Sequence, residues 1–153
     1  MHIRSQKGFS AAELLVVIAI IGIMAAIAIP SMMAYWPTAT VQGAARDLQG
    51  GLTRAKTLAI TTRQNVCVQV VAGGYRFLQG AGPNNCIGAA WTGAGTDATG
   101  LFGAPDNVTF TGAANPIFTP FGTASQAAIL TVTGPSIRTL TVTILPSGRV
   151  TIP

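Results

Sequence analysis

The sequence predicts an α+β fold in which one long N-terminal helix, about residues 9–62, packs under a small antiparallel β-sheet. Residues 14–30 contain no polar side chain, which is typical of a helix that is apolar all round. Residues 41–59 repeat apolar side chains at spacings of three and four, which predicts one buried stripe. The remainder holds short segments rich in Val, Ile, Leu and Thr, separated by glycine and proline, which predicts an antiparallel meander.

The apolar segment is long enough to span a membrane. As a helix, residues 14–36 would be about 34 Å long, against roughly 30 Å for a hydrocarbon core. Arg4 and Lys7 precede it, as on the cytoplasmic flank of an anchor. A cleaved secretory signal would have a shorter apolar core and a small-residue cleavage site, and this segment has neither feature.

Glu13, at the start of the apolar segment, is a candidate functional residue because a carboxylate inside a membrane costs several kcal/mol. A plain membrane anchor would not explain this acid. A helix that first lies in the membrane and later packs against copies of itself would explain it, since a cation on a neighbour could then neutralise Glu13.

The order Gly8-Phe9-Ser10-x-x-Glu13, followed by an apolar helix, resembles the processing site of type IV pilins and type II secretion pseudopilins. The resemblance implies cleavage between Gly8 and Phe9 by a prepilin peptidase, and N-methylation of the new Phe9 amine. It also implies that Glu13 pairs with the N-terminal ammonium of another subunit during filament assembly.

The same resemblance divides the chain into three parts. Residues 1–8 would be a leader peptide that is cleaved, residues 9–36 a transmembrane and filament-core helix, and residues 37–153 a pilin-like globular head that includes the amphipathic half of the helix. Gly22 and Pro30 match helix-breaking positions of pilins and are expected to make the helix flexible.

The partners that the resemblance implies are other pilin or pseudopilin subunits, the prepilin peptidase and an inner-membrane assembly platform. The protein would span the bacterial inner membrane once before assembly. It would then belong to a periplasmic pseudopilus or an extracellular pilus.

The second half of the helix is expected to end near Thr62 and to carry a buried stripe. Pro37 predicts a break or kink, because proline removes a backbone donor. Gly50 and Gly51 each cost about 1 kcal/mol relative to alanine in a helix, so a sheet packed closely over them would be one reason for their presence. The stripe consists of Val41, Ala44, Ala45, Leu48, Leu52, Ala55 and Ala59.

The region after the helix predicts a β-hairpin, a long loop and then further strands. Residues 79–103 show no clear period and are interpreted as the loop, in which Trp91 and Phe102 either anchor to the core or form exposed contacts. The strands are expected within residues 65–71, 75–78, 107–111, 128–133, 138–145 and 149–152, and residues 117–122 are expected to form a strand end and a turn. In residues 139–144, threonines alternate with apolar residues, so one face of that strand should be a threonine ladder.

Cys67 and Cys86 are the two cysteines, and an exported domain with an even cysteine count suggests a disulfide. Two buried free thiols are the alternative. The spacing fits no zinc site, and the one histidine, His2, lies in the predicted leader, so we expect neither a metal nor a cofactor.

We do not expect an enzyme. After cleavage no histidine remains for general base work, and Asp97 and Asp106 are a carboxylate pair only if the loop brings them together. A hydrolase anchored by a single span is the enzyme alternative, and no Gly-x-Ser-x-Gly, phosphate loop or metal cluster supports it.

Three head segments narrow the resemblance to the GspH/FimT-like minor pilins: residues 52–66, residues 118–122 and residues 145–150. This subfamily implies a low-abundance subunit of a pilus tip or a secretion pseudopilus. A major pilin, built from the same helix, is the alternative.

DNA is a further candidate partner, because some FimT-like proteins bind it through a Gly-Arg-x-Arg tail. Gly148 and Arg149 match that tail, but Thr151 stands in place of its second arginine. With a net charge of +5, Arg149 and Arg138 are candidate DNA contacts, to which Arg76 could add. Solvated charges at strand ends are the simpler reading.

Overall fold

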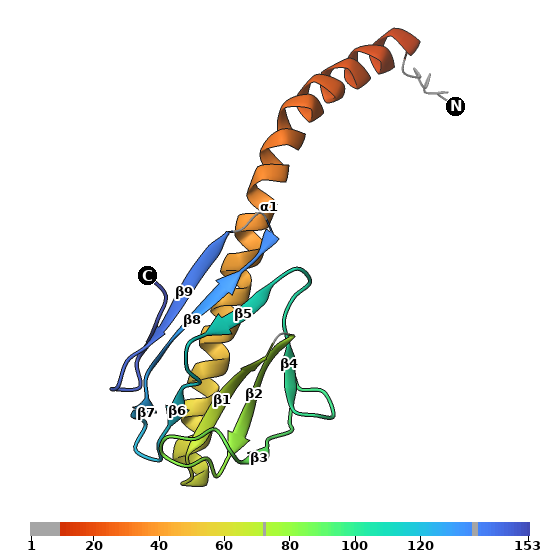
Figure 1. Ribbon diagram of the computed structural model, residues 1–153. Helices are drawn as coiled ribbons and strands as arrows, with labels where there is room; N and C mark the ends of the chain where they lie inside the picture. Colours follow the sequence, from red (N-terminus) through yellow and green to blue (C-terminus); the bar gives the residue numbers. More distant parts are fainter. Residues whose placement is uncertain (1–9, 72, 136–137) are drawn as a thin grey trace, which may run out of the picture. The chain divides into compact units, whose positions relative to one another are not determined.

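The computed structural model describes residues 10–71, 73–135 and 138–153, so the predicted cleavage and methylation positions Gly8 and Phe9 lie outside it. Within these ranges the chain forms one helix, α1 (Ala11–Thr62), followed by short strands in an α+β arrangement, as predicted (Figure 1). The chain divides into two compact units, Met1–Trp36 and Pro37–Pro153.

In the first unit, the large apolar side chains of α1 are exposed. Leu15 is 69% exposed and Met24 66%, and the same holds for the other large side chains of this segment. Residues Ala11–Pro30 are apolar and long enough to cross a membrane, with a mean hydropathy of 2.8 and none of their window buried. This segment therefore has no cover within its own unit.

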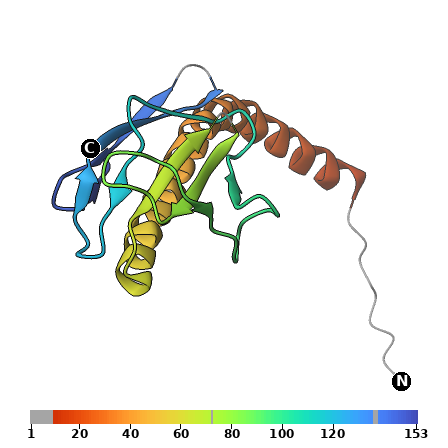
Figure 2. The same ribbon diagram turned by 60° about the horizontal axis from the view of Figure 1, so that its bottom comes forward.

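In the second unit, α1 presents the predicted stripe to the core. Val41, Ala44, Ala45, Leu48, Leu52, Ala55 and Ala59 are all at most 2% exposed. Both sheets lie against this part of the helix (Figures 1 and 2), and the main core joins the stripe to buried residues of both sheets. Small residues dominate the stripe because the strands approach the helix closely.

The first sheet has the order β3-β2-β1-β6-β7, and β4 also pairs with β2. The predicted hairpin is confirmed, with Val66 opposite Gln79 and Val71 opposite Gly74. The strands are β1 (Val66–Val71), β2 (Gly74–Gln79), β3 (Ala89–Ala90), β4 (Leu101–Gly103), β6 (Ile117–Phe118) and β7 (Ala124–Gln126).

The second sheet has the order β10-β9-β8-β5. Its strands are β5 (Thr109–Gly112), β8 (Ala128–Thr133), β9 (Thr139–Ile144) and β10 (Val150–Thr151). The threonine ladder is confirmed, because Val142 and Ile144 are buried while the threonines of β9 lie on the other face. The register extends the ladder across three strands, in the rows Thr109–Thr133–Thr139 and Thr111–Thr131–Thr141.

Three expectations need correction. Helix α1 continues through Pro37, so of the predicted break or kink the break is wrong, and the kink stays a prediction; a proline inside a helix costs one backbone bond but does not have to end it. Residues 79–103 are not structureless, because β3 and β4 both pair with β2. Strand β7 was not predicted; it is a three-residue strand that pairs with β6.

Candidate functional site

Glu13 forms a reciprocal hydrogen-bonded cap with Ser10 at the start of α1. The Ser10 backbone N–H donates to Glu13 Oε2 at 2.9 Å, and the Glu13 N–H donates to Ser10 Oγ at 3.3 Å. This is a capping box, in which two otherwise unpaired helix donors are satisfied. The role of Ser10 was not predicted, although the Ser-x-x-Glu spacing is the signal for it.

The cap leaves Glu13 able to bind a further cation. A carboxylate offers about four acceptor positions, and the capping bond uses one of them. The positive end of the helix dipole also favours a negative group in the first turn. Glu13 is therefore held in place at the start of the apolar segment, with acceptor capacity left over.

Gly22 has no packing role within its own chain. A β-carbon built there would meet nothing within 4 Å, and the residues around it are exposed. Pro30 also lies inside the uninterrupted helix. A glycine on a bare apolar helix lets another helix approach closely. Close packing of a second helix at Gly22 is a role in addition to the helix flexibility that the resemblance implies. That flexibility stays a prediction.

The predicted disulfide is present. Cys67 and Cys86 are bonded, with their Cα atoms 5.4 Å apart, so the free-thiol alternative is wrong. Cys67 is fully buried in a small second core with Leu78, Ala81 and Ile117. The bond therefore fixes the start of the long loop to β1.

Arg54, on α1, holds the other part of the loop. Its guanidinium lies 4.7 Å from the centre of the Trp91 ring and 5.6 Å from that of Phe102, and its Nη1 donates to the Ala94 carbonyl at 2.8 Å. Trp91 and Phe102 pack against the main core, which confirms the anchor interpretation. No local pattern pointed to Arg54, because its partners are about 40 residues away along the chain.

Asp97 organises the tip of the loop. Its Oδ1 accepts bonds from the Leu101 and Thr99 N–H groups and from the Thr99 hydroxyl. The Leu101 amide, followed by the Thr99 hydroxyl, lowers the pKa of the Asp97 carboxyl. In the described ranges no group of three or more His, Cys, Asp or Glu residues is placed to hold a metal ion.

The three arginines considered for DNA binding do not share one strand end. Arg138 precedes β9, whereas Arg149 follows the turn after β9, roughly 20 Å away at about 3.3 Å per residue. Arg76 lies in the other sheet, where its Nε donates to Gln69 Oε1 at 2.7 Å. DNA binding therefore stays a prediction.

Comparison with known proteins agrees with this architecture. The family model of the type II transport protein GspH matches residues 44–148, and the prokaryotic N-terminal methylation motif matches residues 3–29. A fimbrial protein of Moraxella nonliquefaciens is 51% identical over 61 residues, or 40% of this chain. The chain matches only 37% of the length of that relative.

Two solved structures share the fold. The minor pseudopilin EpsH from the type 2 secretion system of Vibrio cholerae superposes with a TM-score of 0.56 and 13% identity, covering 74% of this chain and 95% of that one. The type IV minor pilin FimU of Pseudomonas aeruginosa gives a TM-score of 0.52 and 17% identity, covering 74% and 87%. With the GspH model matching more than half of the residues, the chain belongs to the GspH family of type II transport proteins, which are structural subunits of the pilin and pseudopilin class and not enzymes.

Proposed function

We propose that this chain is a minor subunit of a type IV pilus or a type II secretion pseudopilus, inserted into the filament through the first half of α1. The observation that carries the proposal is the contrast within one helix. Residues 11–30 are apolar and exposed, whereas the stripe from Val41 to Ala59 is covered by the chain's own sheets. An uncovered apolar helix needs lipid or other helices around it.

Processing comes first in this proposal. A prepilin peptidase cleaves between Gly8 and Phe9, removing residues 1–8, and the Phe9 amine is then methylated. The match of the methylation motif to residues 3–29 supports this step. Residues 9–36 then form the membrane-spanning and filament-core helix, and residues 37–153 form the head.

During assembly, the apolar first half of α1 leaves the lipid and packs against neighbouring subunits. While the helix lies in the inner membrane, the Ser10 N–H partly satisfies the Glu13 carboxylate, at the positive end of the helix dipole. An ammonium group on Phe9 of an adjacent subunit then supplies a full opposite charge. An ion left unpaired in the membrane costs about 3 kcal/mol, so the paired state is favoured.

The similarity to pilins and pseudopilins supports the remaining partners in this proposal. The inner-membrane assembly platform would extract the processed subunit, and the filament would stay in the periplasm as a pseudopilus or extend outside the cell as a pilus. The similarity to EpsH and FimU, both described as minor subunits, supports a low copy number.

The test compares Glu13→Gln and Glu13→Ala with the unchanged protein in cells that build the filament. Both variants should be cleaved and membrane-bound, because processing and insertion do not need the charge. Both should enter purified filaments about tenfold less often or worse, since losing roughly 1.4 kcal/mol of pairing is a factor of ten. Mass spectrometry of membranes and filaments measures both quantities.

Ser10→Ala is the matched control, since it removes the Oγ acceptor and leaves the Glu13 charge. It should enter filaments at close to the normal level. The same spectra should show methylated Phe9 as the first residue and a trace share of this subunit. Normal incorporation of Glu13→Gln would remove Glu13 from the mechanism, and a dominant share would make the chain a major pilin.

A further inference from the structure

Three segments that are far apart in the sequence meet at one end of the head. They are residues 52–66 at the end of α1, residues 118–122 at the turn between β6 and β7, and residues 145–150 at the turn between β9 and β10. We call their meeting point the junction. It lies at the last turns of α1, about 30 Å along the helix from Pro37 at 1.5 Å per residue (Figure 1). Strand β10 begins at the junction and runs away from it along β9.

Backbone contacts hold the junction together. Lys56 Nζ donates to the Gly148 carbonyl at 3.2 Å, which joins α1 to the third segment. A β-carbon on Gly148 would overlap the Gly122 carbonyl oxygen, so the second and third segments approach too closely for a side chain there. A β-carbon on Gly122 would lie 3.2 Å from atoms of Lys56 and Ile60. Both glycines also have a positive φ, so their turns need glycine for conformation as well as for close approach.

Phe121 projects from the junction on a closed turn, and its side chain is 91% exposed. The Thr119 N–H donates to the Thr123 carbonyl at 2.8 Å, and the Gly122 N–H donates to the Thr119 carbonyl at 2.9 Å. The hydroxyls of Thr119 and Thr123 also bond to each other at 2.7 Å. The backbone under Phe121 is therefore fixed, so its ring would bind a partner with little further loss of backbone freedom.

The exposed apolar side chains of the head gather around this turn. Among the described residues, the large apolar side chains exposed in the head are Ile60, Ile87, Phe121, Ile129 and Leu145. Ile60, Phe121 and Leu145 belong one to each of the three segments. Leu145 and Ile129 line a hollow of about 410 Å³ on the second sheet. The apolar surface therefore continues from the junction into this hollow.

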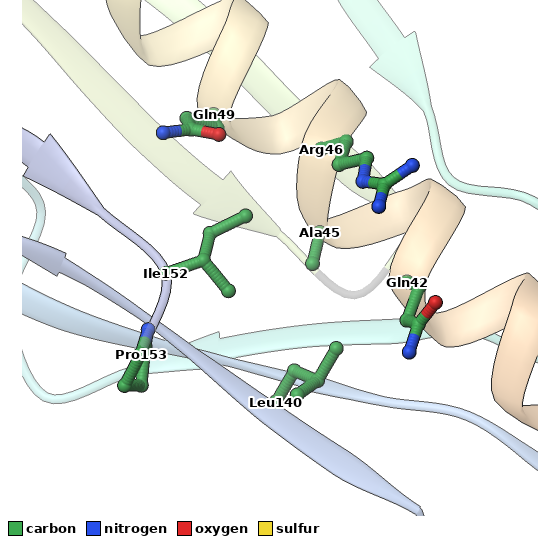
Figure 3. A pocket seen from close by; sticks show the side chains of 7 residues that line it. All are labelled: Gln42, Ala45, Arg46, Gln49, Leu140, Ile152 and Pro153. Carbon is green, nitrogen blue, oxygen red and sulfur yellow. The ribbon is translucent and has the colours of Figure 1, made fainter.

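The hollow suits an apolar occupant. It is formed by alanine, isoleucine, leucine, proline and one threonine, and none of the described residues that line it is charged. The groove between α1 and β9 is different, since Gln42, Arg46 and Gln49 line it (Figure 3). Covering the hollow with apolar side chains would remove no charge from water, so it would not incur the cost of burying an ion.

We propose that the junction binds the head of an adjacent subunit in the filament, with the Phe121 ring as the anchor. This inference rests on the proposed function. A phenylalanine side chain buries at most about 250 Å², whereas a stable complex needs roughly 800 Å² from each partner. The junction can therefore hold only a partner that is already tethered beside it, as bundled helices would tether a neighbouring subunit. It also lies at the end of the head that is far from Pro37, where a subunit displaced along the filament axis would make contact.

The first test places a photoreactive aromatic residue at the anchor. In the full-length chain, p-benzoylphenylalanine replaces Phe121 in cells that build the filament, and purified filaments are irradiated. Position 121 should cross-link to the head of another subunit that carries the N-terminal methylation motif, as identified by mass spectrometry of the joined peptides. The same analogue at Ile87, which is 75% exposed and lies outside the three segments, should give at least about fivefold less of this product.

The second test measures incorporation. Phe121→Ala should lower the share of this subunit in filaments about tenfold, as expected for the loss of an aromatic anchor. Its thermal unfolding should match that of the unchanged protein, because the deleted ring is 91% exposed. Ile87→Ala is the matched control and should enter filaments at the normal level.

The outcomes separate this inference from the proposed function. Absence of the unchanged chain from filaments would refute the proposed function, and the inference would fall with it. If the unchanged chain is present, normal incorporation of Phe121→Ala would refute the anchor alone. Cross-links from position 121 to no subunit, to a protein outside the pilin class, or at the same yield as from position 87 would do the same. Lowered stability of Phe121→Ala would assign Phe121 to the fold of the head instead.

Discussion

The two halves of helix α1 both carry apolar residues, but these residues are distributed and covered in different ways. In the first half, large side chains such as Leu15, Ile21 and Met24 are more than half exposed. In the second half, alanines alternate with Leu48 and Leu52, and the chain's own sheets cover them. The difference teaches that the chain's own sheets cover the half whose apolar residues form one stripe, and leave bare the half that is apolar all round.

Two glycines illustrate the same division. A β-carbon on Gly22, in the first half, would meet none of the described residues within 4 Å, whereas a β-carbon on Gly51 would overlap the hydroxyl and ring of Tyr75. The Tyr75 ring cannot move away cheaply, because it is 6% exposed and stacks on Phe102 with ring centres 5.0 Å apart. Gly51 is therefore explained by the head, whereas no contact of the described residues explains Gly22.

The largest expected effect is a difference in stability between matched substitutions in the two halves of α1. Leu52→Ala should lower the free energy of unfolding of the head by about 2–5 kcal/mol, because it leaves a cavity under both sheets. Leu15→Ala, at a side chain 69% exposed, should change it by less than about 0.5 kcal/mol. Hydrogen exchange of β1 and β8 amides measures both. Equal losses would mean that the two halves fold as one unit.

The second-largest expected effect is a pH dependence of the stability of the head, which packs on the second half of α1. Burial, with a smaller contribution from the Asp47 carboxylate, raises the pKa of Tyr75 from 10.0 to about 12, while Arg54 lowers it in part. The folded state therefore holds the phenol proton more tightly than the unfolded chain. The raised pKa of Tyr75 therefore contributes about 2–3 kcal/mol to the free energy of unfolding. This contribution is complete below pH 10 and is lost as the pH rises through 12.

The measurement is the unfolding free energy against pH, with phenolate absorbance in a Tyr35→Phe background so that Tyr75 is the tyrosine observed. Tyr75→Phe should remove this loss of stability, since it keeps the ring against Gly51 and has no proton to release. The same fall with pH in Tyr75→Phe would assign the effect to another group.

The smallest expected effect is a difference in stability between alanine substitutions at the two neighbouring glycines Gly50 and Gly51. Gly51→Ala should destabilise the head by about 1–2 kcal/mol, because the overlap with Tyr75 exceeds the gain in helix propensity. Gly50→Ala, where a β-carbon meets nothing within 4 Å, should stabilise it by up to about 1 kcal/mol. Thermal unfolding of the two variants gives the comparison, and two shifts of the same sign would contradict it.

Much of the fold could be predicted because its signals are local. The stripe from Val41 to Ala59 fixes the buried face of α1, and β8 was predicted with its observed ends, Ala128 and Thr133. The pairing of Cys67 with Cys86 was also expected, since two cysteines in an exported head leave one intramolecular choice.

The features that were not predicted depend on contacts between residues that are far apart in the sequence. Strands β3 and β4 are two and three residues long and exist because β2 offers them an edge, which no period in the sequence shows. The same holds for Arg54, whose ring partners become neighbours only after the loop folds back onto α1.

The threonine rows of the second sheet have a consequence for the environments in which the head works. Hydroxyl groups neither titrate over the biological pH range nor attract a cloud of counterions. The outer face of β5, β8 and β9 therefore offers the same hydrogen-bond donors and acceptors at low and neutral pH and at low and high salt concentration. This face is formed mainly by Thr109, Thr111, Thr131, Thr133, Thr139 and Thr141.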